Sequence, residues 1–191
     1  FSPSIVFILT AFSFGAVLTL IPDLTMDVGF SPENKGIFFT VFVVASLFIR
    51  FLAGKASDKF GRVIVLKIAA LSIVIADIVL AYAHDKNMLI IGGILFGIAV
   101  GMNTPTLYAW TVDLAIDKFR GKALATMYIA LEIGIGAGAF FGGLIYSNEM
   151  TNMRDAFFTC AVLSLLALLY LNFGIGPINK MLSKRLSDEN S

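Results

Sequence analysis

The chain has 191 residues, of which 58% are hydrophobic and only 14% charged, and its mean hydropathy is +0.90. A soluble domain carries roughly a quarter charged residues, so this composition excludes an ordinary water-soluble protein. The formal net charge of +1 gives no reason to expect a nucleic-acid partner.

Apolar runs recur along the whole chain with short polar breaks between them. Each is close to the roughly 20 residues that cross the hydrocarbon core of a bilayer, and each is apolar all round, unlike the alternating strands of a membrane barrel. The pattern predicts an all-α membrane protein with a six-helix bundle over residues 1–178 and a cytoplasmic tail over 179–191. We expect the transmembrane helices at 4–21, 35–54, 63–83, 87–112, 121–146 and 156–174.

The start of the chain lacks the features of a secretory signal. It begins at Phe1 without a methionine, a basic segment or a small-residue cleavage site. We therefore expect the first apolar run to be a membrane span, and the chain to be a piece of a longer protein.

Basic residues are distributed unevenly between the two sides of the predicted membrane. Eleven of the fourteen Lys and Arg residues lie on the side of the termini and of the second and fourth breaks, and three lie on the other. Because basic residues accumulate in cytoplasmic loops, both termini are expected in the cytoplasm, in a plasma membrane or a bacterial inner membrane. An even number of helices requires the termini to share a side.

The break after the second predicted helix reads Gly54-Lys-Ala-Ser-Asp58-Lys59-Phe-Gly61-Arg62. We expect a tight loop here. Gly54 would permit close helix approach, Gly61 would allow a left-handed turn, Asp58 could cap a helix and Arg62 could pair with a carboxylate. The alternative is an ordinary basic cytoplasmic loop.

This segment resembles the signature loop of the major facilitator superfamily, Gly-x-x-x-Asp-Arg/Lys-x-Gly-Arg-Arg/Lys. Five of its six positions match, and Val63 stands where the family usually has a second basic residue. The resemblance implies a transporter of twelve helices in two halves, each built from two inverted three-helix repeats. Six helices would then be one half, which needs the other half or a second copy as its partner. We expect the C-terminal half, because a polar tail follows the sixth helix and the fourth helix lacks the early basic residue that N-terminal halves often carry, although the signature loop itself is more typical of N-terminal halves.

The resemblance also implies a gate at the cytoplasmic end. There Asp113, at the end of the fourth helix, would pair with Arg62, while Asp58 and Lys59 would face the start of the fifth helix near Arg120. The alternative is that Asp113 is a solvated helix-end residue.

Two carboxylates lie inside apolar runs, Asp77 in the third helix and Glu132 in the fifth. A charge near the bilayer centre is costly, so such a residue usually faces a cavity or a partner and often carries protons. Glu132 is the stronger candidate for proton coupling, because the resemblance implies a cavity between the first, second, fourth and fifth helices and a peripheral third helix. The alternative for Asp77 is a hydrogen bond to a neighbouring helix.

Polar residues in the fourth helix are candidates for the substrate cavity. Asn103, Thr106 and Trp110 share nearly one helical face beside Pro105, and Tyr108 lies between them. Ser13 of the first helix, flanked by Phe12 and Phe14, is a further candidate. The alternative is that the threonines only bond the carbonyls that the proline frees.

The fifth helix carries glycines four residues apart, at Gly134, Gly138 and Gly142, which predicts a smooth face for close helix packing. The stretch from Gly138 to Gly143 also resembles a segment found in proton antiporters of the superfamily, although Ala139 replaces its proline.

The sequence shows no nucleophile, metal or phosphate-loop motif, so we predict neither a cofactor, nor a metal, nor an enzyme. The predicted function is proton-coupled transport of a small solute across the lipid bilayer by alternating access. The alternative is a non-transporting membrane scaffold or regulatory subunit.

Overall fold

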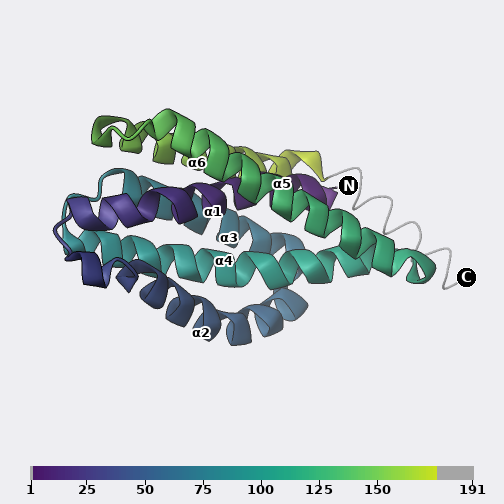
Figure 1. The fold of residues 1–191 in the computed structure, drawn as a ribbon. Helices are drawn as coiled ribbons and strands as arrows, with labels where there is room; N and C mark the ends of the chain where they lie inside the picture. Colours follow the sequence, from purple (N-terminus) through teal and green to yellow (C-terminus); the bar gives the residue numbers. More distant parts are fainter. Residues whose placement is uncertain (1, 176–191) are drawn as a thin grey trace, which may run out of the picture.

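The computed structural model describes residues 2–175, so the tail expected at 179–191 lies outside the described residues. Within this range the chain is helical, and six helices are long and apolar enough to cross a membrane, as predicted. They run side by side along one direction (Figure 1). Their bounds are α1 Ser2–Asp27, α2 Ile37–Phe60, α3 Arg62–Ala81, α4 Lys86–Leu114, α5 Arg120–Tyr146 and α6 Met150–Leu169, with short turns at Pro32–Asn34 and Asp117–Phe119 and a π-helical turn at Tyr170–Gly174.

Several helix ends differ from the prediction. Helix α1 continues through Pro22 to Asp27, six residues beyond the expected end at residue 21. A proline removes one backbone donor but keeps a helical φ, and the residues beyond it are held by packing, since Leu24 is buried in the core. Helix α6 begins at Met150, six residues before the expected start.

The expected loop at 54–62 is also corrected. Helix α2 runs on to Phe60, and Gly61 alone separates it from α3. Ala53 and Ser57 keep one face of this last stretch buried, which extends the helix past Gly54. Gly61 has a φ of 93°, a backbone conformation that favours glycine, so the reversal between the helices is concentrated in one residue.

The main packing partners form a regular pattern. Helix α1 packs against α5 and α6, α4 packs against α2 and α3, and α3 also packs against α6. If α1 is exchanged with α4, α2 with α5 and α3 with α6, the same pairs of helices are in contact. Two three-helix repeats would produce this pattern, and the inverted arrangement of such repeats stays a prediction.

Helices α1 and α5 approach each other closely through glycines on both sides. A Cβ atom at Gly138 would overlap the backbone carbonyl oxygen of Phe12, and one at Gly15 would overlap that of Ile135. A Cβ at Gly134 would lie 2.7 Å from the carbonyl oxygen of Ile8. Backbone-to-backbone contact of this kind requires residues without a side chain.

A second glycine face, which the sequence analysis missed, joins α4 to α2. Cβ atoms at Gly97 and Gly101 would collide with backbone atoms of Phe42 and Ser46. The four-residue spacing of these glycines is the same signal that predicted the packing face of α5. The close contact brings polar residues of α2 and α4 toward one region of the bundle.

Exposure is uneven among the helices. Helix α1 is the most deeply buried span, and α2 and α5 are the most exposed. The α2 face includes Phe48 and Phe51, which are 72% and 78% exposed, and the α5 face includes Phe140, which is 66% exposed. Large apolar side chains on these faces meet lipid or another protein surface.

Candidate functional site

A cavity of about 320 Å³ lies among α1, α2, α4 and α5. Each of these helices contributes residues that recur three or four positions apart, so one stripe of each helix faces the cavity. Its lining consists mainly of Phe7, Thr10, Ala11, Phe14, Phe42, Val43, Ser46, Leu47, Arg50, Val100, Asn103, Thr104, Leu131 and Ile135. The hollow is therefore largely apolar, with a few polar groups.

The two ends of this cavity differ in chemistry. Phe14 and Phe42 lie at one end with their ring centroids 5.9 Å apart, and Phe96 packs against both from behind. Arg50 follows Phe42 by two turns on the same stripe of α2, so it lies toward the other end. Thr104 of α4 also lines the cavity. The cavity thus has paired aromatic rings at one end and Arg50 toward the other, where Phe7, two turns before Phe14 on α1, also lies.

Asn103 is buried in the wall of the cavity with a fixed orientation. Its Nδ2 donates to Thr10 Oγ1 at 2.9 Å, and the Thr10 hydroxyl in turn donates to the Val6 carbonyl at 2.9 Å. Because that hydroxyl proton is used, Thr10 accepts from the amide nitrogen. The Oδ1 atom of Asn103 then has no hydrogen-bond partner among residues 2–175.

Of the five residues expected to line the cavity, Asn103 alone does so. Ser13, Thr106 and Trp110 are buried inside the bundle. Tyr108 is half-buried and packs edge-on against Phe7, with their centroids 6.0 Å apart. The face of α4 that carries Asn103, Thr106 and Trp110 therefore points partly into the interior of the bundle. The other polar residues of the cavity lining were not among those expected.

Arg50, Ser46 and Thr10 also line the cavity, and none of them was predicted from the sequence to do so. Ser46 and Arg50 are one turn apart in an otherwise apolar run, which is the signal that could have identified a polar stripe on α2.

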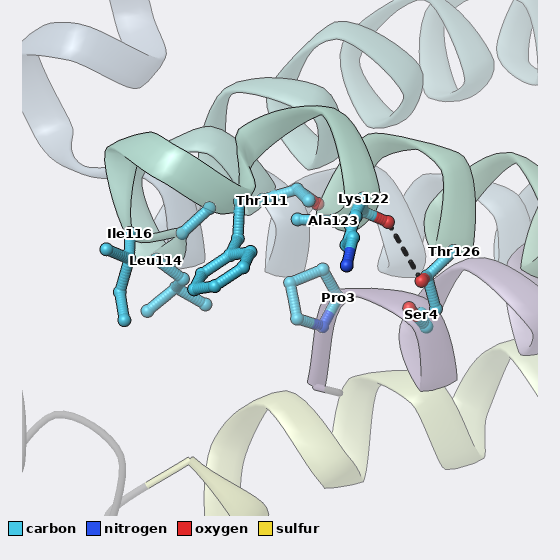
Figure 2. A pocket seen from close by; sticks show the side chains of 10 residues that line it. Pro3, Ser4, Thr111, Leu114, Ile116, Lys122, Ala123 and Thr126 are labelled. Carbon is cyan, nitrogen blue, oxygen red and sulfur yellow. Dashed lines mark hydrogen bonds between the residues drawn. The ribbon is translucent and has the colours of Figure 1, made fainter.

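A second hollow, of about 490 Å³, lies between the start of α1 and the connection from α4 to α5. Figure 2 shows Pro3 and Ser4 on one side and Lys122 and Thr126 on the other, with the Thr126 hydroxyl donating to the Lys122 carbonyl at 2.9 Å. The hollow lies at the end of the bundle where α4 ends and α5 begins, away from the four-helix cavity.

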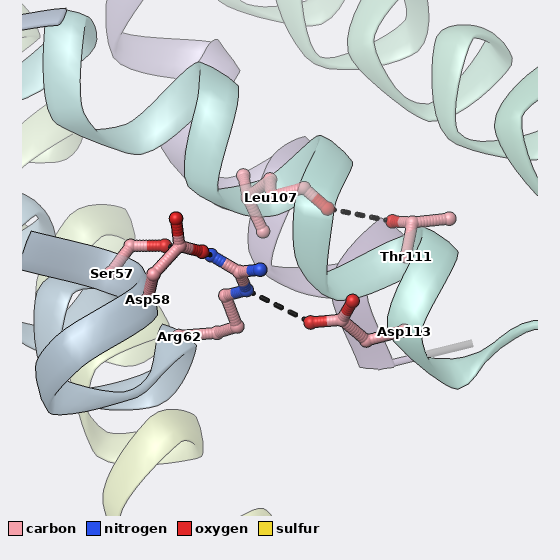
Figure 3. Close-up of polar contacts among 6 residues, drawn as sticks. All are labelled: Ser57, Asp58, Arg62, Leu107, Thr111 and Asp113. Atoms are coloured by element: carbon pink, nitrogen blue, oxygen red, sulfur yellow. Dashed lines mark hydrogen bonds and ion pairs between the residues drawn. The ribbon is translucent and has the colours of Figure 1, made fainter. Parts of the chain in front are cut away.

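The guanidinium of Arg62 links the ends of three helices. At the start of α3, its Nε donates to Asp113 Oδ2 of α4 at 2.8 Å, while its Nη1 contacts Ser57 and Asp58 of α2 (Figure 3). The Arg62 side chain is 23% exposed and that of Asp113 is 47% exposed. This cluster brings together three of the residues expected at the gate.

The other expected gate residues lie outside the Arg62 cluster. Arg120 pairs with Asp117, three residues earlier, at 2.9 Å. A Cβ at Gly54 would meet nothing within 4 Å, so this glycine makes no close helix approach, contrary to the expectation. Lys59 lies over a neighbouring aromatic ring. Asp58 contacts Arg62 instead of capping a helix.

Asp77 is fully buried within α3. Ser13 of α1 donates its hydroxyl toward both carboxyl oxygens, at 2.6 and 2.7 Å. The expected alternative for Asp77, a hydrogen bond to a neighbouring helix, is what the structure contains. Helix α3 packs between α4 and α6, so Asp77 lies in the interior of the bundle and not at its periphery.

Glu132 lies on the exposed face of α5, one turn beyond Tyr128. It forms no hydrogen bond or ion pair with another residue in the part of the chain that the structure describes. Glu132 is therefore accessible on this bundle, in contrast to Asp77.

In the part of the chain that the structure describes, no group of three His, Cys, Asp or Glu side chains is placed to hold a metal ion.

Residues 4–190 match the Major Facilitator Superfamily. The chain belongs to that superfamily. It is 26% identical to a triacylglyceride transporter of Mycolicibacterium smegmatis over 90% of this chain and 31% of that protein. It is 28% identical to multidrug resistance protein 1 of Bacillus subtilis over 80% of this chain and 39% of that protein.

Solved structures of superfamily transporters share the fold. A human organic anion transporter superimposes with a TM-score of 0.77 at 18% identity, over 89% of this chain and 45% of that one. The inward-open xylose transporter of E. coli gives 0.74 at 20% identity, over 90% and 46%. The chain thus spans less than half the length of these superfamily members, and it is a multi-pass membrane protein whose six helices match part of each solved structure.

Proposed function

We propose that the chain is part of a secondary transporter that moves a small solute across the membrane by alternating access. The observation that carries this proposal is the cavity among α1, α2, α4 and α5, whose volume of about 320 Å³ falls in the range of small-molecule sites. Its lining combines an apolar wall with a few polar groups, as ligand pockets usually do. Similar proteins are named as transporters of a triacylglyceride, of an organic anion and of xylose, which supports transport as the general activity.

The Arg62 cluster acts as a gate in this proposal. It ties α2, α3 and α4 together at one end of the bundle, so breaking it would let these ends separate. Because Arg62 and Asp113 are both partly exposed, the pair contributes about 0.2–1 kcal/mol. A contribution of this size biases an equilibrium between two conformations, up to about fivefold, without locking either one.

Proton coupling, the finer part of the proposal, involves Asp77 and Glu132. An ionised carboxylate at the centre of a membrane helix costs about 2.5–3.5 kcal/mol on insertion scales. In this proposal Asp77, whose hydrogen-bond partner is the Ser13 hydroxyl, carries a proton while α1 and α3 are packed together and releases it when α1 moves and water enters. Glu132 lies on a face that a second half would cover, and it would exchange its proton as the two halves open and close.

The test uses this chain together with its second six-helix half, reconstituted in liposomes. Glu132→Gln and Asp77→Asn are compared with Glu149→Gln, an exposed loop residue, in two assays. A coupling substitution should abolish uphill solute movement driven by a pH gradient and spare solute exchange, which needs no net proton movement. Coupling lies elsewhere if both variants keep gradient-driven transport. Failure of the unmodified protein to move any solute of a broad panel would favour the scaffold alternative.

The partner in this proposal is a second six-helix half, supplied by the same polypeptide or by a second copy of the chain. The exposure of α2 and α5 supports it, because these two helices contribute to the cavity lining and are the most exposed spans. Both termini would face the cytoplasm of a plasma membrane or a bacterial inner membrane, as the distribution of basic residues indicates.

A further inference from the structure

Arg50 gives the four-helix cavity a charge. It lies on the lining stripe of α2, and no aspartate or glutamate is among the residues that line the cavity. Within residues 2–175, Arg50 also forms no ion pair. A guanidinium is always protonated, so the cavity carries one positive charge that the described lining does not neutralise.

The position of Arg50 along α2 separates it from the basic end of the helix. Arg50 precedes the end of α2 at Phe60 by ten residues, which is about 15 Å of helix. Lys55 and Lys59 follow it nearer that end and line no part of the cavity. The charge of Arg50 therefore lies within the cavity lining, apart from the basic residues nearer the end of the helix.

The rest of the lining is chemically complementary to an amphiphilic molecule. Around Arg50 the other polar side chains of the lining are uncharged, among them Ser46, Thr10 and Asn103, so none of them repels an oxyanion, and the Ser46 hydroxyl can donate a hydrogen bond to it. At the far end, the paired rings of Phe14 and Phe42 offer an apolar surface. A charged head and an apolar body would thus each meet a matching end of the cavity.

We propose that this cavity binds an amphiphilic organic anion, with its carboxylate, sulfonate or phosphate group at Arg50 and its apolar body against Phe14 and Phe42. The inference rests on the proposed function, because it names the substrate class of the same cavity. Guanidinium and oxyanion pair through two parallel hydrogen bonds, which gives both energy and orientation. A cation of the same shape would be repelled.

The test compares three probes that share one skeleton, namely 4-phenylbutyrate, 4-phenylbutanol and 4-phenylbutylamine. Their dissociation constants are measured by titration calorimetry on this chain together with its second half in detergent. Phenylbutyrate should bind most tightly and phenylbutylamine least. Since a hydrogen bond to a charged group is worth about 1.5–3 kcal/mol, Arg50→Gln should weaken phenylbutyrate about tenfold or more and phenylbutanol less than twofold.

Three further variants control for indirect effects. Arg50→Lys keeps the charge but loses the paired geometry, so it should retain part of the affinity for phenylbutyrate. Lys55→Gln, on the same helix and outside the cavity lining, should change none of the three constants. Phe14→Ala should weaken all three probes to a similar extent. An unchanged elution profile in size-exclusion chromatography shows that each variant is folded.

The inference is overturned if phenylbutylamine binds as tightly as phenylbutyrate, if Arg50→Gln leaves the preference intact, or if no probe binds at millimolar concentration. Liposome transport of the same probes separates this outcome from failure of the proposed function. Anion-selective binding without transport would support the anion site and contradict the proposed transport function. Transport of another solute without anion preference would support the proposed transport function and contradict the anion site.

Discussion

The close contact between α1 and α5 predicts opposite effects for the same substitution at two neighbouring glycines. Gly138 faces α1, where a Cβ atom would overlap the carbonyl oxygen of Phe12. Gly136 lies two residues away on the same helix, and a Cβ atom there would meet nothing within 4 Å. Gly136→Ala is therefore a matched control for Gly138→Ala, because both change the intrinsic helix propensity equally.

The magnitude follows from two opposing contributions. Alanine in a helix interior is favoured over glycine by about 0.5–1 kcal/mol, and this gain should be retained at Gly136. At Gly138 the added methyl group forces α1 and α5 apart, and overpacking of this kind costs about 1–3 kcal/mol. Because the gain in helix propensity is the same at both positions, the two variants should differ by the overpacking cost alone, about 1–3 kcal/mol. For a chain of this size, 1 kcal/mol shifts the Tm by about 2–4 °C, so a separation of several degrees is expected.

The single cysteine of the chain provides the assay. Cys160 is 1% exposed, so a fluorogenic thiol reagent reacts with it only when the bundle opens. Thermal scans in detergent, with any cysteine of the second half replaced, should give a lower Tm for Gly138→Ala than for the unmodified protein, and an equal or higher Tm for Gly136→Ala. Equal Tm values for the two variants would refute the reasoning that α1 and α5 need a side-chain-free contact at Gly138.

Two further predictions concern the gate and the orientation. Arg62→Gln removes a contribution of up to about 1 kcal/mol from one conformation, so it should lower turnover more than equilibrium solute binding. Asp113→Asn should reproduce the effect. Equal loss of binding, turnover and expression would instead indicate a role in folding. With Cys160 replaced by Ala, an impermeant thiol reagent added to whole cells should label a cysteine at Asn148 and spare one at Lys118, both exposed loop positions. The opposite labelling would place the termini outside the cell.

The sequence by itself determined the class of fold and the family. Six apolar runs of membrane-spanning length are sufficient to predict six helices, because a bilayer offers no other partner for the backbone polar groups. The glycine spacing of α5 also indicated a packing face, since residues four apart in a helix lie on one side whatever surrounds them. The signature residues Asp58, Gly61 and Arg62 indicated the superfamily to which the chain belongs.

Only the tertiary structure decided which polar side chains face the cavity and which face a neighbouring helix. Within an apolar helix, periodicity shows that Ser13 and Asn103 each lie on some face, but every face is apolar and the pattern does not say which one is open. Packing of α1 against α5 and α3 turns Ser13 toward Asp77, and packing of α4 against α2 brings Asn103 and Arg50 to one cavity. Local sequence specifies a helix through its own hydrogen bonds, whereas the direction of a side chain is set by residues far away in the chain.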